Sequence, residues 1–432
     1  MKKVIFIIAP LFVLVAIIAW NKSGNNNSVP NTLIDCSGTP NTAPQSTDST
    51  IESFRQAMVE FRASLSDELL KTASACLDDK RLTEWSNVPP KFNARDGINY
   101  GQLTPSQLTA FKELLQLFLS AEGYQKVDEI TVLAEGFLNT KNPKIFGPNK
   151  YHISLFGDPV NSGSWGFQLD GHHCAINFLV HGDNVSIVPA FMGAEPIVGA
   201  FNNINFDIIK DERDMGLSLY HGLSAIENRA ATSSQGVAKL QVGPPSIKGV
   251  DAFAGNYDYS QFSNGLKYSD MSETTQANLI LLMKEYVYNL NTKFADIWWA
   301  DVMANIDETY FVWLDNVESP TTKTQFYYRI YNPYLWAEFS VEPPVEKSIE
   351  LWNHAHSITR IPNNPTTTKG GDYGLFAQII NNGGVRTMYE HYISAEHHME
   401  SKLFLDYKVE LHGFHNYDHN HSHAHNENHT HS

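Results

Sequence analysis

The chain has 432 residues, of which 42% are hydrophobic, so it holds enough apolar material for a substantial core. Acidic residues outnumber basic ones by 47 to 31, which gives a formal net charge of −16. Because no basic stripe offsets this charge, a nucleic-acid partner is disfavoured. The chain has only three cysteines, so it is not a scaffold built on disulfides.

The first 20 residues predict an export signal. Lys2 and Lys3 carry positive charge, and an uncharged apolar run at 4–20 follows. The run is near the shortest length that spans a bilayer, so a cleaved signal peptide and a retained membrane anchor are both open. We expect an exported protein, periplasmic or extracellular, that meets the membrane only through this segment. Residues 21–50 are rich in Asn, Ser, Thr, Gly and Pro and predict a flexible linker.

Three helices are indicated in the folded part of the chain. Apolar residues at steps of three and four predict an amphipathic helix from about 51 to 77. The next helix begins after Thr104, where Pro105 and Gln107 complete a capping box. A third helix opens at Ser272 and repeats the apolar spacing of the second.

Strand-like segments follow the second and the third helix in the same order. They span 151–155, 165–169 and 175–180 after the second helix, and 310–314, 326–330 and 335–341 after the third. We interpret this as an internal duplication. The predicted fold class is α+β, with two pseudo-repeated halves at about 100–200 and 270–360, each with helices followed by an antiparallel sheet. The alternative is coincidence between generic helix and strand patterns.

Two histidine pairs point to a metal site. His172 and His173 lie where the apolar alternation changes parity, which requires a turn or a bulge. His354 and His356 would project from one face of a strand, so both rings can reach one Zn²⁺ or Cu²⁺. We predict a composite site of these four histidines, with one of the first pair as a ligand and the other as a hydrogen-bonding partner. A purely structural role for each pair is equally open.

Further polar residues are expected near such a site. Six of them are candidates for orienting the rings or for binding a substrate: Asp170, Asn177, Arg329, Glu338, Arg360 and Asp372. For the two arginines, the alternative is a buried ion pair with Glu338 or Asp372. Glu195 or Asp372 would be the base if the metal activated a water molecule. Cys174 is interpreted as a small buried side chain rather than a ligand.

The segment 409–432 predicts a disordered tail that binds metal. It has almost no apolar residues and carries histidines in an alternating pattern among Asn, Asp, Glu and Ser. The tail histidines are His412, His415, His419, His421, His423, His425, His429 and His431. Such a segment binds Zn²⁺, Ni²⁺ or Cu²⁺ weakly at several sites, and a merely solubilising tail is the alternative.

Several segments together resemble the bacterial domain-of-unknown-function 3500 family. They are 165–173 with its Gly-His-His, 189–196, 310–313, 327–333, 354–360, and Asp372-Tyr373-Gly374. The resemblance covers about 50 to 395 and implies one family domain, which we place at 51–408. Two features depart from the family pattern, namely a longer Thr-rich insert after Arg360 and the histidine-rich tail. The family name supplies no reaction.

These observations predict an exported protein that binds a divalent transition metal at the composite histidine site and through its tail. Zinc is the first choice, with copper or nickel as alternatives. A second hypothesis is an extracytoplasmic metal-dependent hydrolase with a small-molecule substrate. A third is a module that binds a small molecule or carbohydrate without metal. The known hydrolase, phosphate-loop and Cys-x-x-Cys motifs are absent from the sequence. Convergence of the two histidine pairs in space would favour the metal hypotheses.

Overall fold

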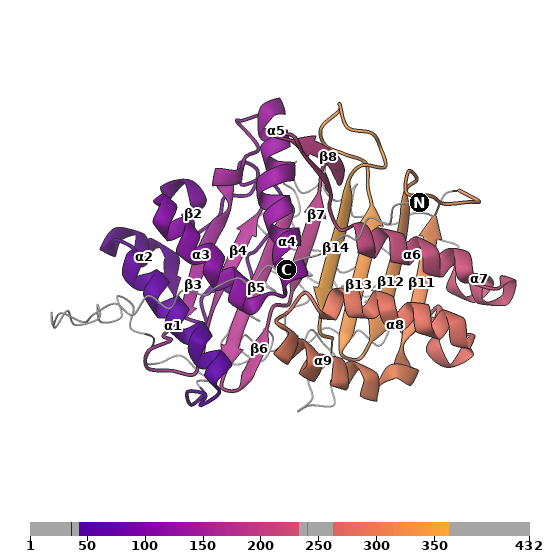
Figure 1. The fold of residues 1–432 in the computed structure, drawn as a ribbon, viewed down its shortest axis with the longest axis horizontal. Helices are drawn as coiled ribbons and strands as arrows, with labels where there is room; N and C mark the ends of the chain where they lie inside the picture. The colour runs from indigo at the N-terminus through magenta and orange to yellow at the C-terminus, as the bar shows by residue number, and fades with distance from the viewer. Residues whose placement is uncertain (1–35, 37–42, 233–239, 241–261, 316, 363–432) are drawn as a thin grey trace, which may run out of the picture. The chain divides into compact units, whose positions relative to one another are not determined.

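A computed structural model of the chain describes residues 36, 43–232, 240, 262–315 and 317–362. These residues form a mixed α and β structure around one 12-stranded sheet with the order β1-β3-β4-β5-β7-β14-β13-β12-β11-β10 (Figure 1). In addition, β2 pairs with β3 and β6 pairs with β5. The strands are β1 (Ser74–Ala75), β2 (Ile98–Asn99), β3 (His152–Gly157), β4 (Ser164–Gly171), β5 (Cys174–His181), β6 (Asn184–Ser186), β7 (Ala190–Ala194), β10 (Leu266–Lys267), β11 (Tyr310–Asp315), β12 (Phe326–Asn332), β13 (Leu335–Val341) and β14 (Ala355–Arg360).

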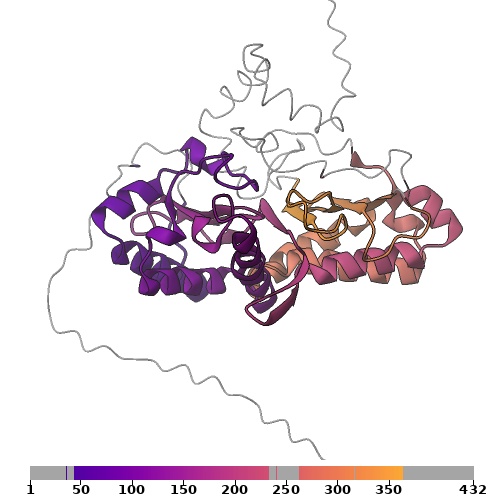
Figure 2. The same ribbon diagram turned by 90° about the horizontal axis from the view of Figure 1, so that it is seen from above.

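Most of the long helices lie along one face of the sheet (Figure 2). The helices are α1 (Ser49–Ser64), α2 (Asp67–Ala73), α3 (Pro105–Phe118), α4 (Ala121–Asp128), α5 (Glu135–Lys141), α6 (Lys210–Gly222), α7 (Ala225–Ala231), α8 (Glu273–Val287) and α9 (Thr292–Ala304). Alternate strand side chains, such as Ile176 and Phe178, pack with these helices in the main core. A separate two-stranded sheet joins β8 (Val198–Phe201) and β9 (Ile204–Asp207).

The opposite face of the large sheet, which we call the outer face, has a smaller apolar cluster. Leu179, Phe191 and Ile358 project from it and pack against Leu82 and Trp85 of the segment that follows β1. Polar strand residues share this face, because side chains alternate along a strand and those next to inward-facing residues point outward. The outer face therefore combines this apolar cluster with polar side chains of the strands.

The predicted helix starts are confirmed where a local cap defines them. The Thr104 hydroxyl accepts a hydrogen bond from the Gln107 N–H at 3.3 Å, and the Gln107 side chain accepts one from the Thr104 N–H at 2.9 Å. Ser272 caps α8 through the Thr275 N–H at 3.3 Å. The single helix expected from 51 to 77 is wrong, because the chain is extended at Leu65 and a new N-cap at Ser66 starts α2.

All six predicted strands are present, but they do not form two separate sheets. β7 pairs with β5 on one side and with β14 on the other, so both sets of strands belong to one sheet. Without this pairing β5 and β14 would each leave open backbone hydrogen-bonding groups at an edge, which proteins avoid. The duplication itself stays a prediction.

The parity change between β4 and β5 is a tight turn rather than a bulge. Gly171 lies opposite Cys174, and the register continues without a break to Ser164 opposite His181. His172 and His173 are therefore the two residues of the connecting turn. His173, the second residue of the turn, has a φ of 62°, in the left-handed region that is uncommon for residues other than glycine.

Two further features differ from or add to the sequence predictions. Residues 43–50, assigned to the linker, contribute to the folded structure, since the Ala43 N–H donates to the Ser164 hydroxyl at 2.7 Å. Cys36 and Cys76 form a disulfide that the sequence did not indicate, whereas Cys174 is free and buried in the core.

Among the described residues, no helix has the length and apolar character needed to cross a membrane. The predicted signal segment, Asp372 and the histidine-rich tail lie outside the described residues.

Candidate metal centre

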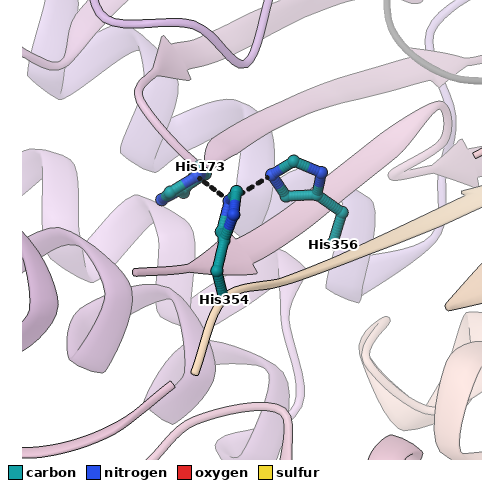
Figure 3. Close-up of side chains that lie close together, drawn as sticks. All are labelled: His173, His354 and His356. Atoms are coloured by element: carbon teal, nitrogen blue, oxygen red, sulfur yellow. Dashed lines mark hydrogen bonds between the residues drawn. The ribbon is translucent and has the colours of Figure 1, made fainter. Parts of the chain in front are cut away.

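The two histidine pairs meet in space. The Nε2 atom of His354 lies 3.1 Å from Nε2 of His173 and 2.8 Å from Nε2 of His356. Figure 3 shows the ring of His354 between the other two rings. One ligand nitrogen from each of these residues lies within 4.8 Å of the others, so the three histidines form a group that can hold a metal ion.

The strand pairing explains why residues so far apart in sequence converge. His356 lies on β14, opposite Gly193 of β7, and the Gly193 N–H donates to the His173 carbonyl at 2.7 Å. Gly193 therefore connects β14 with the β4–β5 turn. A Cβ atom at this position would lie 2.7 Å from the Ala355 carbonyl oxygen, so the close approach requires glycine.

Two rings of the group are oriented by acceptors on their far side. Nδ1 of His354 donates to the Pro343 carbonyl at 2.9 Å, since a carbonyl oxygen can only accept. Nδ1 of His356 faces the Glu342 carboxylate at 3.1 Å. In neutral rings these contacts put the proton on Nδ1 and leave a lone pair on each Nε2. The 2.8 Å contact between the two Nε2 atoms then needs a proton on one ring or a metal ion between them.

Burial disfavours extra protons in this group. The exposed fractions of His173, His354 and His356 are 4%, 4% and 8%. Removal from water, together with the neighbouring His356 ring, lowers the pKa of His354 to about 3. Burial and the adjacent His172 ring also lower the pKa of His173 well below its usual value. His173 and His354 are thus neutral near pH 7, which is the form that binds metal.

The side chain of His172 contacts Glu135 and the ring of His173. Its Nδ1 contacts a carboxylate oxygen of Glu135, whose second oxygen accepts from the Gly147 N–H at 2.9 Å. The ring of His172 stacks on that of His173 with centroids 3.7 Å apart. Glu135, His172 and His173 also form a group whose ligand atoms lie within 4.8 Å of one another. The turn thus places His173 against His354, whereas His172 contacts Glu135.

Glu195 lies beside His354. Its side chain is fully buried, and its Oε2 atom lies 3.9 Å from Nε2 of His354. Oε2 has no hydrogen-bond partner among the described residues, whereas Oε1 accepts from the Glu346 N–H. Burial raises the pKa of this carboxyl. The sequence interpretation considered Glu195 only as a base.

The other predicted polar residues take part in other contacts. Asp170 forms an ion pair with Arg95 at 2.8 Å, and Asn177 accepts from Gln168 at 2.7 Å. Glu338 accepts from the side chains of Tyr327 and Trp336. The remaining two are Arg329, which donates to Asn264, and Arg360, which lies over the Trp85 ring. None of the contacts described for these five residues reaches one of the four histidines.

Sequence reasoning missed Glu135 and Glu342. Glu135 directly follows a π-helical turn at Glu129–Ala134, and a π-helical turn has no sequence pattern that would have marked it. The position of Glu342 near the histidines could have been predicted from the sequence. Glu342 follows β13 directly, and its N–H donates to the His354 carbonyl at 3.0 Å, so pairing β13 with β14 in register would have placed it beside the histidines.

A comparison with known protein families gives a match that covers these residues. The family described as "Protein of unknown function (DUF3500)" matches residues 47–374, which is most of the chain and includes both histidine pairs. The chain belongs to the DUF3500 family. Neither the curated proteins nor the solved structures gave a match to this DUF3500 protein.

Proposed function

We propose that this DUF3500 protein binds one divalent transition metal ion, zinc as the first choice, through Nε2 of His173, His354 and His356. The observation that carries the proposal is the convergence of three buried imidazole nitrogens, two of them only 2.8 Å apart. A proton shared by two rings accounts for one of the two Nε2–Nε2 contacts. A metal ion bound to all three nitrogens accounts for both contacts. Neutral imidazole nitrogens suit Zn²⁺ and also Cu²⁺ and Ni²⁺, which leaves copper and nickel as alternatives.

Two of the three separations between the nitrogens are close to those of a tetrahedral zinc site, and the third is within 4.8 Å. Zn–N bonds of about 2.05 Å imply ligand nitrogens about 3.3 Å apart. The separations of 2.8 and 3.1 Å need only small ring rotations to reach this value. The contacts of Nδ1 with Pro343 and Glu342 hold the rings of His354 and His356 in the orientation that a metal requires.

The test uses a full-length chain whose eight tail histidines are replaced, from His412→Asn to His431→Asn, and which we call the tail-substituted chain. After equilibration with zinc and removal of free metal, we expect one zinc ion per chain by elemental analysis. His356→Ala should reduce the content to a small fraction. The matched control is His181→Ala, because the His181 ring bonds Ser164 Oγ at 2.9 Å and lies outside the group. A tail-substituted chain without stoichiometric metal would overturn the proposal.

The tail is proposed to capture further ions. Its support is the alternating histidine pattern of the sequence. We expect calorimetry to show uptake of more than one additional ion, in the micromolar range, by the unsubstituted protein compared with the tail-substituted chain. Identical uptake by the two proteins would refute this role.

Export is proposed from the N-terminal apolar segment and is supported by the Cys36–Cys76 disulfide, because disulfides persist in oxidising compartments. The protein purified from its native source without reductant should show one reactive thiol after denaturation, that of Cys174. Three reactive thiols, together with recovery from the cytoplasmic fraction, would contradict export.

The duplication is likewise a proposal. Its support is the shared order of a short strand, a 3₁₀ turn and a capped helix in β2–α3 and in β10–α8, followed in both stretches by three antiparallel strands. Two-residue turns connect β4 with β5 and β12 with β13. If the stretches 98–181 and 266–341 do not superpose on each other in an experimental structure, the duplication is refuted.

A further inference from the structure

The position of Glu195 at the end of β7 places its carboxylate next to His354. Glu195 directly follows β7, two residues after Gly193, and residues two apart on a strand share a face. Continuing the register of Gly193 with His356 and of Ala194 with Ala355 places Glu195 opposite His354. Directly opposed residues of an antiparallel pair have side chains on the same face. The distance of 3.9 Å between Glu195 Oε2 and His354 Nε2 agrees with this placement.

The environment of Glu195 is unfavourable for a carboxylate unless a cation is near. The side chain is 0% exposed, and Oε2 has no hydrogen-bond partner among the described residues. Burying an ionised carboxylate without a partner costs several kcal/mol. The side chain is nevertheless held in place, because Oε1 accepts from the Glu346 N–H. Glu195 Oε2 is thus held near His354 although it accepts no hydrogen bond from the described residues.

We propose that Glu195 Oε2 is the fourth ligand of the metal ion and completes a closed site of three histidines and one carboxylate. This inference rests on the proposed function above. A tetrahedral ion with bonds of about 2.0 Å brings ligand atoms to about 3.3 Å from one another, so the 3.9 Å between Oε2 and Nε2 of His354 must shorten by about half an ångström. Glu195 lies outside the group whose ligand atoms are within 4.8 Å of one another, so its carboxylate must also turn towards His173 and His356 when the ion binds. The carboxylate leaves a net charge of +1 on the buried unit, which lowers the penalty of burying a divalent ion.

Two consequences follow for the role of the ion. With four protein ligands there is no open position for water or substrate, and closed tetrahedral sites are structural. The ion then ties together the β4–β5 turn, the end of β7 and the start of β14. The oxygen ligand also selects the metal, because carboxylates suit Zn²⁺ and Co²⁺ better than Cu⁺, which prefers sulfur.

The experiment uses cobalt as the probe in the full-length tail-substituted chain. Four-coordinate Co²⁺ absorbs visible light much more strongly than five- or six-coordinate Co²⁺, so its spectrum reports the number of ligands. We expect an intense four-coordinate spectrum that added azide does not change. Glu195→Gln should weaken the absorption as water enters the site, make the spectrum sensitive to azide, and lower zinc affinity by at least about tenfold.

The matched control is Glu346→Gln. Its side chain is half-exposed and accepts from the Ser348 N–H, while its backbone N–H still holds Glu195. This variant should keep the cobalt spectrum and the zinc affinity. Metal-free Glu195→Gln should unfold at the same or a higher temperature than the parent, because it removes a buried charge. A large fall in that temperature would indicate a structural carboxylate and would count against the proposal.

The outcomes distinguish a failure of the proposed metal binding from a failure of the proposal that Glu195 is a ligand. If the parent binds neither zinc nor cobalt, the proposed function fails and the inference fails with it. If the parent binds metal through His356 but Glu195→Gln keeps its affinity and spectrum, only the inference is overturned. A parent spectrum that changes with azide would also overturn it, because it shows an open position and leaves Glu195 as a base beside bound water.

Discussion

Zinc should raise the melting temperature of the tail-substituted chain by an amount that depends on zinc concentration. A ligand that binds only the folded state at about 100 times its Kd stabilises that state by about 2.7 kcal/mol. For roughly 300 folded residues, the unfolding entropy near the midpoint is about 0.6 kcal/mol per degree. We therefore expect a rise of about 4 °C at this concentration, and about 2 °C more for each further tenfold increase.

Differential scanning calorimetry across a zinc titration, with a chelator-treated sample as the reference, measures this slope. His356→Ala removes one of the three nitrogens that converge at the site, so its melting temperature should change little with zinc. His181→Ala should keep the parental slope, because its ring contacts Ser164 rather than the site. Comparing slopes rather than absolute temperatures separates loss of metal binding from any general destabilisation by the substitution.

Two results would refute the reasoning. One is a parental melting temperature that does not respond to zinc over the range in which calorimetry detects binding, since binding to the native state must stabilise it. The other is a His356→Ala variant with the parental slope, which would place the bound ion elsewhere in the molecule. Either result would leave the close contacts of the three rings to be explained by protons and packing alone.

Three further predictions concern the surroundings of the site and the fold. Glu342→Gln should lower zinc affinity by about 10–100-fold in calorimetry, because it weakens the acceptor that orients the His356 ring; an unchanged affinity would contradict that role. Cys36→Ser should reduce the free energy of unfolding by up to about 4 kcal/mol in urea, the value expected for a disulfide that closes a loop over a separation of 40 residues; the parent under reducing conditions should lose the same amount. Burial raises the pKa of Glu227, but hydrogen bonds from the N-caps of α8 and α7 outweigh it and hold the pKa at about 2. Because this folded-state pKa is depressed, its stabilisation is present above about pH 4.5 and is lost as the pH falls towards 2. Glu227→Gln should therefore destabilise the protein at pH 7 by about 1–3 kcal/mol and by little at pH 2; an equal difference at both values would contradict this assignment.

The sequence predicted those parts of the structure that depend on short-range physics. The capping box at Thr104 and the cap at Ser272 need only residues within one turn, and both start helices at the expected positions. Alternation of apolar residues identified the strands for the same reason. The pattern of residues 51–77 misled because the break at Leu65 and Ser66 leaves the apolar spacing nearly intact while a local cap restarts the helix.

Contacts between distant segments were not predictable in the same way. The contact between His173 and His354 spans 181 residues, and nothing in either histidine motif specifies which strands lie between them. The disulfide was missed because cysteine spacing alone does not define a pairing. The prediction of separate sheets failed because the pairing of β7 with β14 depends on where the chain between them travels, which a local pattern does not encode.

The strand β7 explains both what the sequence missed and why the site exists. It lies between β5 and β14, so its pairing merges the two sets of strands into one sheet and brings the β4–β5 turn towards the start of β14. Gly193 carries this connection, since its N–H holds the His173 carbonyl while its lack of a side chain leaves room for the His356 ring. Glu195 then follows on the same face. One short strand thus positions a histidine from each side and supplies a carboxylate of its own, and a change in its register would move all three together.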